Sequence, residues 1–143
     1  MSKKFRYVLA FLILALISVL IVWKYTFRKA EVSMESRKPD FKLEAYRLVQ
    51  EFETNETAAN SLYLDRIVVV TGTIASVSED SVGISVYLKE RDALSGIICS
   101  FDKTAIEVSA VDTGLLVSVK GVCTGYLMDV VMNKCALEQE SDK

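Results

Sequence analysis

The hydrophobic pattern of the chain begins with an uninterrupted apolar run, Tyr7–Trp23, that contains no charged residue. As an α-helix this run would span about 26 Å, which approaches the ~30 Å hydrocarbon core of a bilayer. Tyr7, Trp23 and Tyr25 stand at its two ends, where aromatic rings favour the membrane interface. We therefore predict a membrane anchor over residues 1–29, with its transmembrane part at about 7–25.

The alternative to a permanent anchor is a cleaved secretory signal peptide. The apolar run is longer than the hydrophobic region of such signals, and no A-x-A cleavage site follows it. No cysteine follows the run directly, which argues against a lipoprotein signal. The pattern therefore favours an uncleaved signal anchor.

The orientation of this anchor depends on the cations beside it. Three Lys or Arg residues precede the run and five follow it before Pro39, so the count alone favours a cytoplasmic domain. A short basic tail ahead of a first apolar helix usually stays in the cytoplasm, however, and the following domain is then translocated. We expect a single-pass protein of the inner or plasma membrane whose C-terminal domain lies outside the cytoplasm, while the cation count leaves the opposite orientation open.

Residues 30–39 are polar and of mixed charge, and we interpret them as a tether that ends at Pro39. Apolar residues then recur at helical spacing: Phe41, Ala45, Leu48 and Phe52. This stripe predicts an amphipathic helix over Asp40–Glu53, with Asp40 as its N-cap and the stripe packed on the rest of the domain. A second short helix follows, with Thr54 or Asn55 as its cap.

The longest strand-like pattern is Asp65–Val77, a β-branched run with one glycine in its middle. Alternation places Val68, Val70, Gly72 and Ile74 on one face. The other face is also apolar or β-branched, so we expect both faces to have little contact with solvent. Gly72 is where this strand could bend sharply, because glycine has no Cβ. We predict that it is the long first strand of a small closed barrel, shared by two sheets.

Four further segments alternate or carry apolar runs typical of strands: Val82–Lys89, Gly96–Phe101, Leu115–Cys123 and Asp129–Leu137. Asp102–Asp112 is interpreted as a short helix or irregular connection, and Thr124–Met128 as a turn. Five strands with an insert between the third and fourth have the element order of an OB barrel. We therefore predict a mainly β fold: a five-stranded OB-type barrel preceded by an amphipathic helix, over residues 40–138, with one N-terminal transmembrane helix. Residues 139–143 form a polar tail.

Charge divides unevenly between the two parts. The first 29 residues carry six Lys or Arg and no acid, whereas the rest carry 11 basic and 19 acidic residues, a net charge of −8. So acidic a domain repels nucleic acid and anionic lipid at long range. The chain has no histidine, the commonest general base and metal ligand, and no phosphate-binding glycine motif. We therefore expect a protein that is not an enzyme and that has no cofactor or metal.

Three cysteines allow three possible single disulfides. If the last two strands form a regular hairpin, Cys123 lies near the turn and Cys135 lies opposite a residue near Val117, too far for a bridge. In an OB barrel the third and fifth strands are parallel neighbours, so Cys99 and Cys135 could approach each other. We favour three buried thiols that act as small apolar residues. Their scattered spacing does not predict a zinc site.

The residues best suited to a binding face of the barrel are Tyr87, Lys89 and Lys120. On an OB-type sheet an aromatic ring can stack on a base, and cations can meet phosphate. One tyrosine with two lysines is a small set for that task. We therefore favour an ordinary solvated sheet face over a binding face at these positions.

The soluble part resembles the membrane-anchored OB-fold proteins of the tRNA-anti-like family over residues 40–137. Ahead of the first strand, a segment similar to N-E-x-x-A-x-x-x-Y contains Asn55, Glu56, Ala59 and Tyr63. The first and third strands are similar to V-x-V-x-G-x-V and C-x-F, at Val68, Val70, Gly72, Ile74, Cys99 and Phe101. The longest similarity, to G-x-x-V-x-V-K-G-x-C-x-G-x-x-x-D-V-x-x-x-x-C-x-L, falls on Gly114, Val117, Val119, Lys120, Gly121, Cys123, Gly125, Asp129, Val130, Cys135 and Leu137. Asp65-Arg66 departs from the family's usual Gly-Lys.

This resemblance implies an OB fold and no enzymatic activity. The family name comes from similarity to anticodon-binding domains and does not establish RNA binding. We interpret the motif residues as structural, with Asn55 and Glu56 in helix capping and a hydrogen bond onto the barrel. Asp129 is interpreted as a turn residue that accepts backbone N–H bonds.

Two functions remain. We favour a non-catalytic, membrane-tethered OB-fold binding module for a protein, peptide or small ligand outside the cytoplasm. The alternative is a nucleic-acid-binding OB domain on the cytoplasmic face of the membrane. The fold supports that alternative, whereas the net charge of −8 and the scarcity of aromatic residues on the strands oppose it.

Overall fold

The computed structural model describes residues 2–27 and 33–138. The chain divides after Ser33 into two compact units, which are described separately. The predicted tail, residues 139–143, and the first part of the predicted tether lie outside the described residues.

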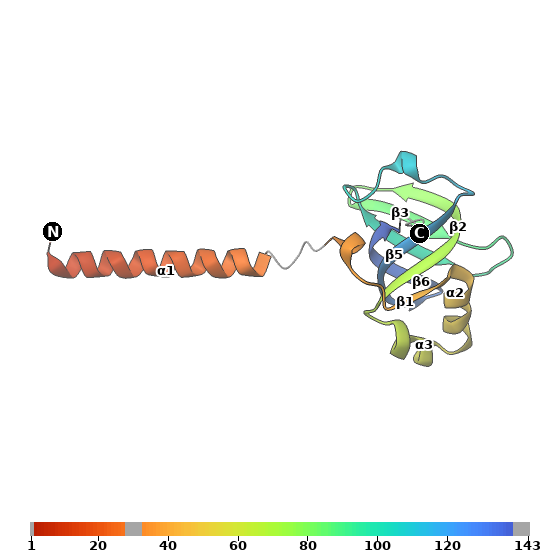
Figure 1. Cartoon of the computed structure of the whole chain (residues 1–143), viewed down its shortest axis with the longest axis horizontal. Helices are drawn as coiled ribbons and strands as arrows, with labels where there is room; N and C mark the ends of the chain where they lie inside the picture. The colour runs from red at the N-terminus through yellow and green to blue at the C-terminus, as the bar shows by residue number, and fades with distance from the viewer. Residues whose placement is uncertain (1, 28–32, 139–143) are drawn as a thin grey trace. The chain divides into compact units, whose positions relative to one another are not determined.

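The first unit is helix α1, Lys3–Phe27 (Figure 1). Its segment Lys3–Lys24 is long and apolar enough to cross a membrane. Large apolar side chains are exposed on all sides of this segment, and its one serine, Ser18, donates its hydroxyl to the carbonyl oxygen of Ala15 at 2.7 Å. A helix that is apolar all round has no polar face to turn toward water, so the structure supports the predicted span by length and composition.

The second unit is a closed five-stranded β-barrel, as predicted. Its strands are β2 (Ile67–Glu79), β3 (Gly83–Leu88), β4 (Ile97–Asp102), β5 (Leu116–Leu127) and β6 (Asp129–Leu137). They pair in the order β2-β3-β4-β6-β5, and a β2–β5 pairing closes the barrel. The β4–β6 pair is parallel and the others are antiparallel, so the predicted parallel contact of the third and fifth predicted strands is confirmed.

Strand β2 has partners on both edges, as predicted for a shared strand. Its second face has more contact with solvent than predicted, because Val69 is buried but Thr73 is exposed. On one edge, its first half pairs with β5 from Ile67 to Thr73. On the other edge, a sixth short strand, β1 (Phe41–Glu44), pairs with it in parallel, and β3 continues along the same edge from Ile74. The sequence did not predict β1.

This added strand corrects the predicted helix over Asp40–Glu53. The helix α2 spans Ala45–Thr54 and begins after Glu44. Asp40 is not an N-cap: its carboxylate accepts the backbone N–H of Ile67 at 2.9 Å, and its own N–H donates to the Ile67 carbonyl at 2.7 Å. The free edge of β2 offers main-chain partners that a helix over these residues would leave unpaired.

The rest of the predicted apolar stripe packs as expected. Ala45, Leu48 and Phe52 are buried in the same core as the barrel strands, and Phe41 packs its ring edge-on against Tyr63 with centroids 4.9 Å apart. The next helix, α3 (Glu56–Tyr63), is capped by the Asn55 side chain. These two helices lie together beside one end of the barrel (Figure 1).

Gly72 has a different role from the predicted bend. The register of β2 shifts between Ile74 and Ser76, whereas Gly72 keeps a regular pairing with Val117. A Cβ at Gly72 would lie 2.7 Å from the Cβ of Ala45. The glycine is therefore required where α2 packs directly on the β2 backbone.

On β3 and β4 the barrel interior follows the alternation of the sequence, because Ile84, Val86, Leu88, Ile97, Cys99 and Phe101 are buried. Val82, the first residue of the predicted strand Val82–Lys89, precedes β3 and is 83% exposed, so the strand begins one residue later than predicted. Asp80 forms the turn here, because its carboxylate accepts the backbone N–H groups of Val82 and Gly83. The connection from β4 to β5 contains only a short 3-10 helix, η3 (Val108–Ala110), as the irregular pattern predicted.

The predicted turn at Thr124–Met128 is wrong, because β5 continues to Leu127 and the chain reverses at Met128 alone. The pairing of β5 with β6 contains two register shifts, and Gly125 and Met128 adopt positive φ values of 133° and 69°. Because the chain reverses at Met128, Cys135 does not lie near Val117 as predicted; its Sγ lies where a Cβ on Gly121 would come within 2.7 Å. Cys99, Cys123 and Cys135 are free and buried, as we favoured.

The described end of the predicted tether is part of the domain. Met34–Ser36 forms a 3-10 helix, η2, that contacts β5 and β6, and Met34 is buried. The domain therefore begins at Met34, several residues before the predicted boundary at residue 40.

Candidate functional site

The outer surface of the sheet is formed by rows of side chains that cross neighbouring strands. In one row Tyr87 of β3 lies beside Ile98 of β4, which lies beside Val131 of β6. In the next row the pairing and alternation bring together uncharged polar residues: Ser78, Ser85, Ser100 and Asn133. Neither of these two rows contains a cation, the kind of side chain that binds a phosphate backbone.

Tyr87 is fixed on this surface by Asp129. Its hydroxyl donates to Asp129 Oδ1 at 2.8 Å, and the same oxygen accepts the backbone N–H of Gly96 at 2.8 Å. Burial, together with the hydrogen bond and the negative charge of Asp129, raises the pKa of Tyr87 to about 12. The prediction that Asp129 accepts a backbone N–H bond is confirmed, and the tyrosine ring is held by the strand-connecting residues rather than left free to stack.

Lys120 is not on the predicted binding face. It is 4% exposed, and its ammonium donates to the carbonyl oxygens of Glu35 at 2.9 Å and Arg37 at 3.1 Å. It also forms an ion pair with Glu138 at 2.8 Å. The prediction of a solvated sheet face is therefore wrong for Lys120, because η2 and Arg37 cover this position and share its ammonium with Glu138.

The structure brings the other two predicted residues together. The Lys89 ammonium lies 6.0 Å from the centroid of the Tyr87 ring, at the outer limit of a cation–π contact. Of the three predicted residues, Tyr87 and Lys89 are therefore neighbours, and Lys120 belongs to a separate structural cluster.

The family-motif residues have structural partners in the described part of the chain. Asn55 accepts the backbone N–H of Ala58 at 3.0 Å as the cap of α3, which confirms its predicted role, and Glu56 is exposed in the first turn. The Tyr63 hydroxyl donates to Glu51 at 2.7 Å. Burial first, and then this bond and the charge of Glu51, raise the pKa of Tyr63 to about 12.

The remaining motif residues shape the barrel. Gly121 leaves space for the Cys135 sulfur, and Gly125 supplies a positive φ within the irregular β5–β6 pairing. Cys135 donates to the Met132 carbonyl at 3.4 Å. Burial is the main cause that raises the pKa of Cys123, so this thiol is a weak nucleophile.

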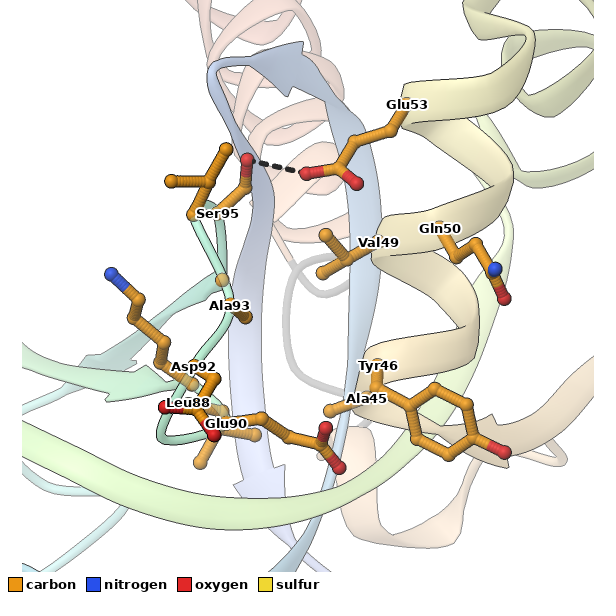
Figure 2. A pocket seen from close by; sticks show the side chains of 13 residues that line it. Ala45, Tyr46, Val49, Gln50, Glu53, Leu88, Glu90, Asp92, Ala93 and Ser95 are labelled. Atoms are coloured by element: carbon orange, nitrogen blue, oxygen red, sulfur yellow. Dashed lines mark hydrogen bonds between the residues drawn. The ribbon is translucent and has the colours of Figure 1, made fainter.

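A concave site lies elsewhere, between α2 and the β3–β4 loop, and we call it the α2–loop pocket (Figure 2). Its volume is about 320 Å³, which is within the ~300–1,000 Å³ range of ligand sites. The floor is apolar and comes from both elements: Ala45, Val49, Leu88 and Ala93. The rim carries Glu53, Glu90, Asp92 and Lys89.

The walls of the α2–loop pocket are joined at one end. The Ser95 hydroxyl of the loop donates to Glu53 Oε1 of α2 at 2.7 Å. Figure 2 shows Glu53 and Glu90 at opposite ends, with Val49 and Ala93 between them. Sequence reasoning missed this site because its two walls are distant in the chain; the one local signal was the apolar pair Ala93-Leu94 within a charged loop.

The α2–loop pocket combines an apolar floor with carboxylates at its rim. Within residues 2–27 and 33–138, no group of three His, Cys, Asp or Glu side chains could hold a metal ion. In that part of the chain the carboxylates of the α2–loop pocket form no ion pair. What the pocket offers is an apolar surface bounded by negative charge.

Comparison with protein families identifies the chain over nearly its whole length. The model of the tRNA_anti-like family matches residues 1–137. The chain belongs to the tRNA_anti-like family. The similarity recognised in its glycine, cysteine and valine motifs is thereby confirmed. A comparison with curated proteins gave no match.

Two solved structures are similar to this tRNA_anti-like protein. A candidate nucleic acid-binding lipoprotein from Klebsiella pneumoniae subsp. pneumoniae MGH 78578 is similar with a TM-score of 0.62 and 16% identity, over 72% of this chain and 100% of that chain. OBody NL8, in complex with hen egg-white lysozyme, is similar with a TM-score of 0.37 and 12% identity, over 54% of this chain and 99% of that chain. The likeness to the Klebsiella protein shows a shared fold.

Proposed function

We propose that this chain is a non-catalytic OB-fold binding module, held at a membrane by α1, that recognises a protein segment outside the cytoplasm. The observation that carries the proposal is the α2–loop pocket and its surroundings. Two large apolar residues stand at the pocket without apolar cover: Tyr46 is 50% exposed and Leu94 is 94% exposed. An apolar hollow with exposed apolar neighbours is typical of a surface that binds another protein.

The remaining parts of the proposal rest on the helix and on the chemistry of the chain. The apolar segment Lys3–Lys24 supports membrane attachment, and the short basic tail before it supports a translocated domain. A chain without histidine, whose cysteines are buried and whose tyrosine hydroxyls at positions 63 and 87 are hydrogen-bonded, offers few groups for catalysis.

The topology can be tested with a single introduced thiol. The native cysteines are at most 2% exposed, so a Thr104→Cys variant at an exposed position has one accessible thiol. We expect a membrane-impermeant maleimide to label this variant in spheroplasts before lysis. Labelling only after lysis would place the domain in the cytoplasm and reject the proposed location.

Nucleic-acid binding is the second candidate, and the similar fold of the candidate nucleic acid-binding lipoprotein favours it. Against it stand the buried Lys120 and the uncharged rows on the outer sheet. The test is a titration of the full chain in neutral detergent micelles against labelled single-stranded DNA and RNA at low salt. Micromolar binding that weakens steeply with added salt would favour this candidate over the protein-binding module.

A further inference from the structure

The α2–loop pocket has the shape of a site for an extended aliphatic chain. Val49 and Ala93 face each other across its middle, and the two exposed carboxylates of Glu53 and Glu90 lie at its ends (Figure 2). Ala45, Val49 and Leu88 are each at most 6% exposed, so this floor is held firmly by the core. An occupant that lies along it covers apolar surface and ends beside a carboxylate.

The negative charge of the rim favours an occupant with a positive charge. Glu53, Glu90 and Asp92 outnumber the single cation of the lining, Lys89, whose ammonium lies near the Tyr87 ring. In the described part of the chain, none of these three carboxylates is in an ion pair. Each carboxylate can therefore accept a charge-assisted hydrogen bond from a cation that enters the pocket.

The neighbours of the pocket favour a side chain of a protein over a free amine. Tyr46 on the α2 side and Leu94 on the loop side extend apolar surface beyond the hollow, and both are exposed. A small amine would leave this surface uncovered. A polypeptide covers it with the residues that flank a central basic side chain.

We infer that the α2–loop pocket binds a lysine or arginine side chain of a partner segment, with its aliphatic stem on Val49 and Ala93 and its charge at Glu53 or Glu90. This inference rests on the proposed function, since it names the chemistry that the module recognises. Lys and Arg combine an apolar stem with a charged end, which is the pattern of this pocket. Apolar residues on both sides of the basic residue cover Tyr46 and Leu94.

Two synthetic peptides test the inference on the unaltered protein. The first is acetyl-Gly-Leu-Lys-Leu-Gly-amide, and the second replaces lysine by norleucine, which keeps the stem and removes the charge. The full chain, ¹⁵N-labelled in neutral detergent micelles, is titrated with each peptide and followed by amide chemical shifts. We expect the lysine peptide to shift the amide signals of Val49, Ala93 and Ser95, and to bind about two- to fivefold more tightly than the norleucine peptide.

Matched variants locate the interaction. Glu53→Gln combined with Glu90→Gln should weaken binding of the lysine peptide about two- to fivefold. Glu107→Gln, an exposed carboxylate outside the pocket lining, should leave the affinity unchanged. Added salt should weaken binding to the unaltered chain and to Glu107→Gln more than binding to the double variant.

Several results would overturn the inference. Equal affinity for the two peptides would show an apolar occupant, and shifts confined to other surfaces would place the ligand elsewhere. Butane-1,4-diamine that shifts the pocket while the lysine peptide does not would point to a free amine. The Thr104→Cys labelling tests the proposed location independently of these peptide titrations. Failure of the inference can therefore be distinguished from failure of the proposed function.

Discussion

The replacement of Lys120 by methionine is the sharpest test of how this domain is held together. The lysine is 4% exposed and joins three parts of the chain: strand β5, the η2 segment through two carbonyl oxygens, and Glu138 through an ion pair at 2.8 Å. Methionine fills similar volume but cannot donate a hydrogen bond. The variant therefore leaves the carbonyls of Glu35 and Arg37 without their donor and removes the nearer of two cations from Glu138.

The size of the effect follows from these contacts. A hydrogen bond to a charged group contributes about 1.5–3 kcal/mol, and breaking a fully buried ion pair costs about 3–5 kcal/mol. Glu138 keeps some contact with water and a second cation, Lys42, at 3.5 Å, which reduces the loss. We expect Lys120→Met to lower the free energy of unfolding by about 2–4 kcal/mol.

Urea denaturation of the full chain in mild detergent, followed by the near-UV circular dichroism of the tyrosines, measures this loss. The matched control is Lys103→Met, which removes an exposed ion pair with Glu79 at 3.6 Å and should cost at most about 1 kcal/mol. Hydrogen exchange should also become faster at Arg37, whose N–H is bonded to the Met34 carbonyl. A Lys120→Met variant as stable as the control would refute the structural role of this lysine.

The same cluster has a pH dependence with a definite sign. Burial alone would raise the pKa of Glu138, but the hydrogen bond and charge of Lys120, with Lys42, lower it below its usual 4.5. A carboxyl whose pKa is lower in the folded state stabilises the fold above about pH 4.5, and this stabilisation is lost as the pH falls through the folded pKa. The stability difference between the natural chain and Lys120→Met should therefore narrow in acid.

Three further predictions concern the barrel. Gly72→Val should lower the melting temperature, because its Cβ would lie 2.7 Å from the Ala45 Cβ, at a cost of about 1–3 kcal/mol in the free energy of unfolding. A second substitution, Ala45→Gly, should restore part of this loss. An unchanged melting temperature would contradict the close packing of α2 on β2. All three thiols should resist Ellman's reagent in the folded chain and react after unfolding in guanidinium; a single reactive thiol after unfolding would reveal a disulfide. The Tyr87 phenol should ionise near pH 12 in an ultraviolet titration, and at lower pH in Asp129→Asn. Its contribution to the stability of the fold should be present below pH 10 and be lost as the pH rises toward 12. An unshifted titration in the variant would exclude the Asp129 contact as a cause of the raised pKa.

The sequence by itself determined the features that depend on local periodicity and residue type. Alternation on β3 and β4 predicted which residues point inward, because side chains on a strand must take opposite faces and one face of a barrel is closed. The unbroken apolar run of α1 identified a candidate span from composition alone. Asn55 was predicted as a cap from residue type, because its amide oxygen reaches the free N–H groups at the start of α3.

Only the tertiary structure decided the features that depend on segments distant in the chain. Phe41–Glu44 is a strand because the edge of β2 was open, although the local pattern was helical. Lys120 is buried because residues 34–37 return over β5 and present carbonyls to it, a contact that no alternation on β5 contains. The α2–loop pocket exists because α2 and residues 89–96 lie opposite each other, although by sequence they read as an ordinary helix face and a charged loop. Hydrogen bonding and packing between these remote segments, and not local propensity, place the carboxylates around an apolar floor.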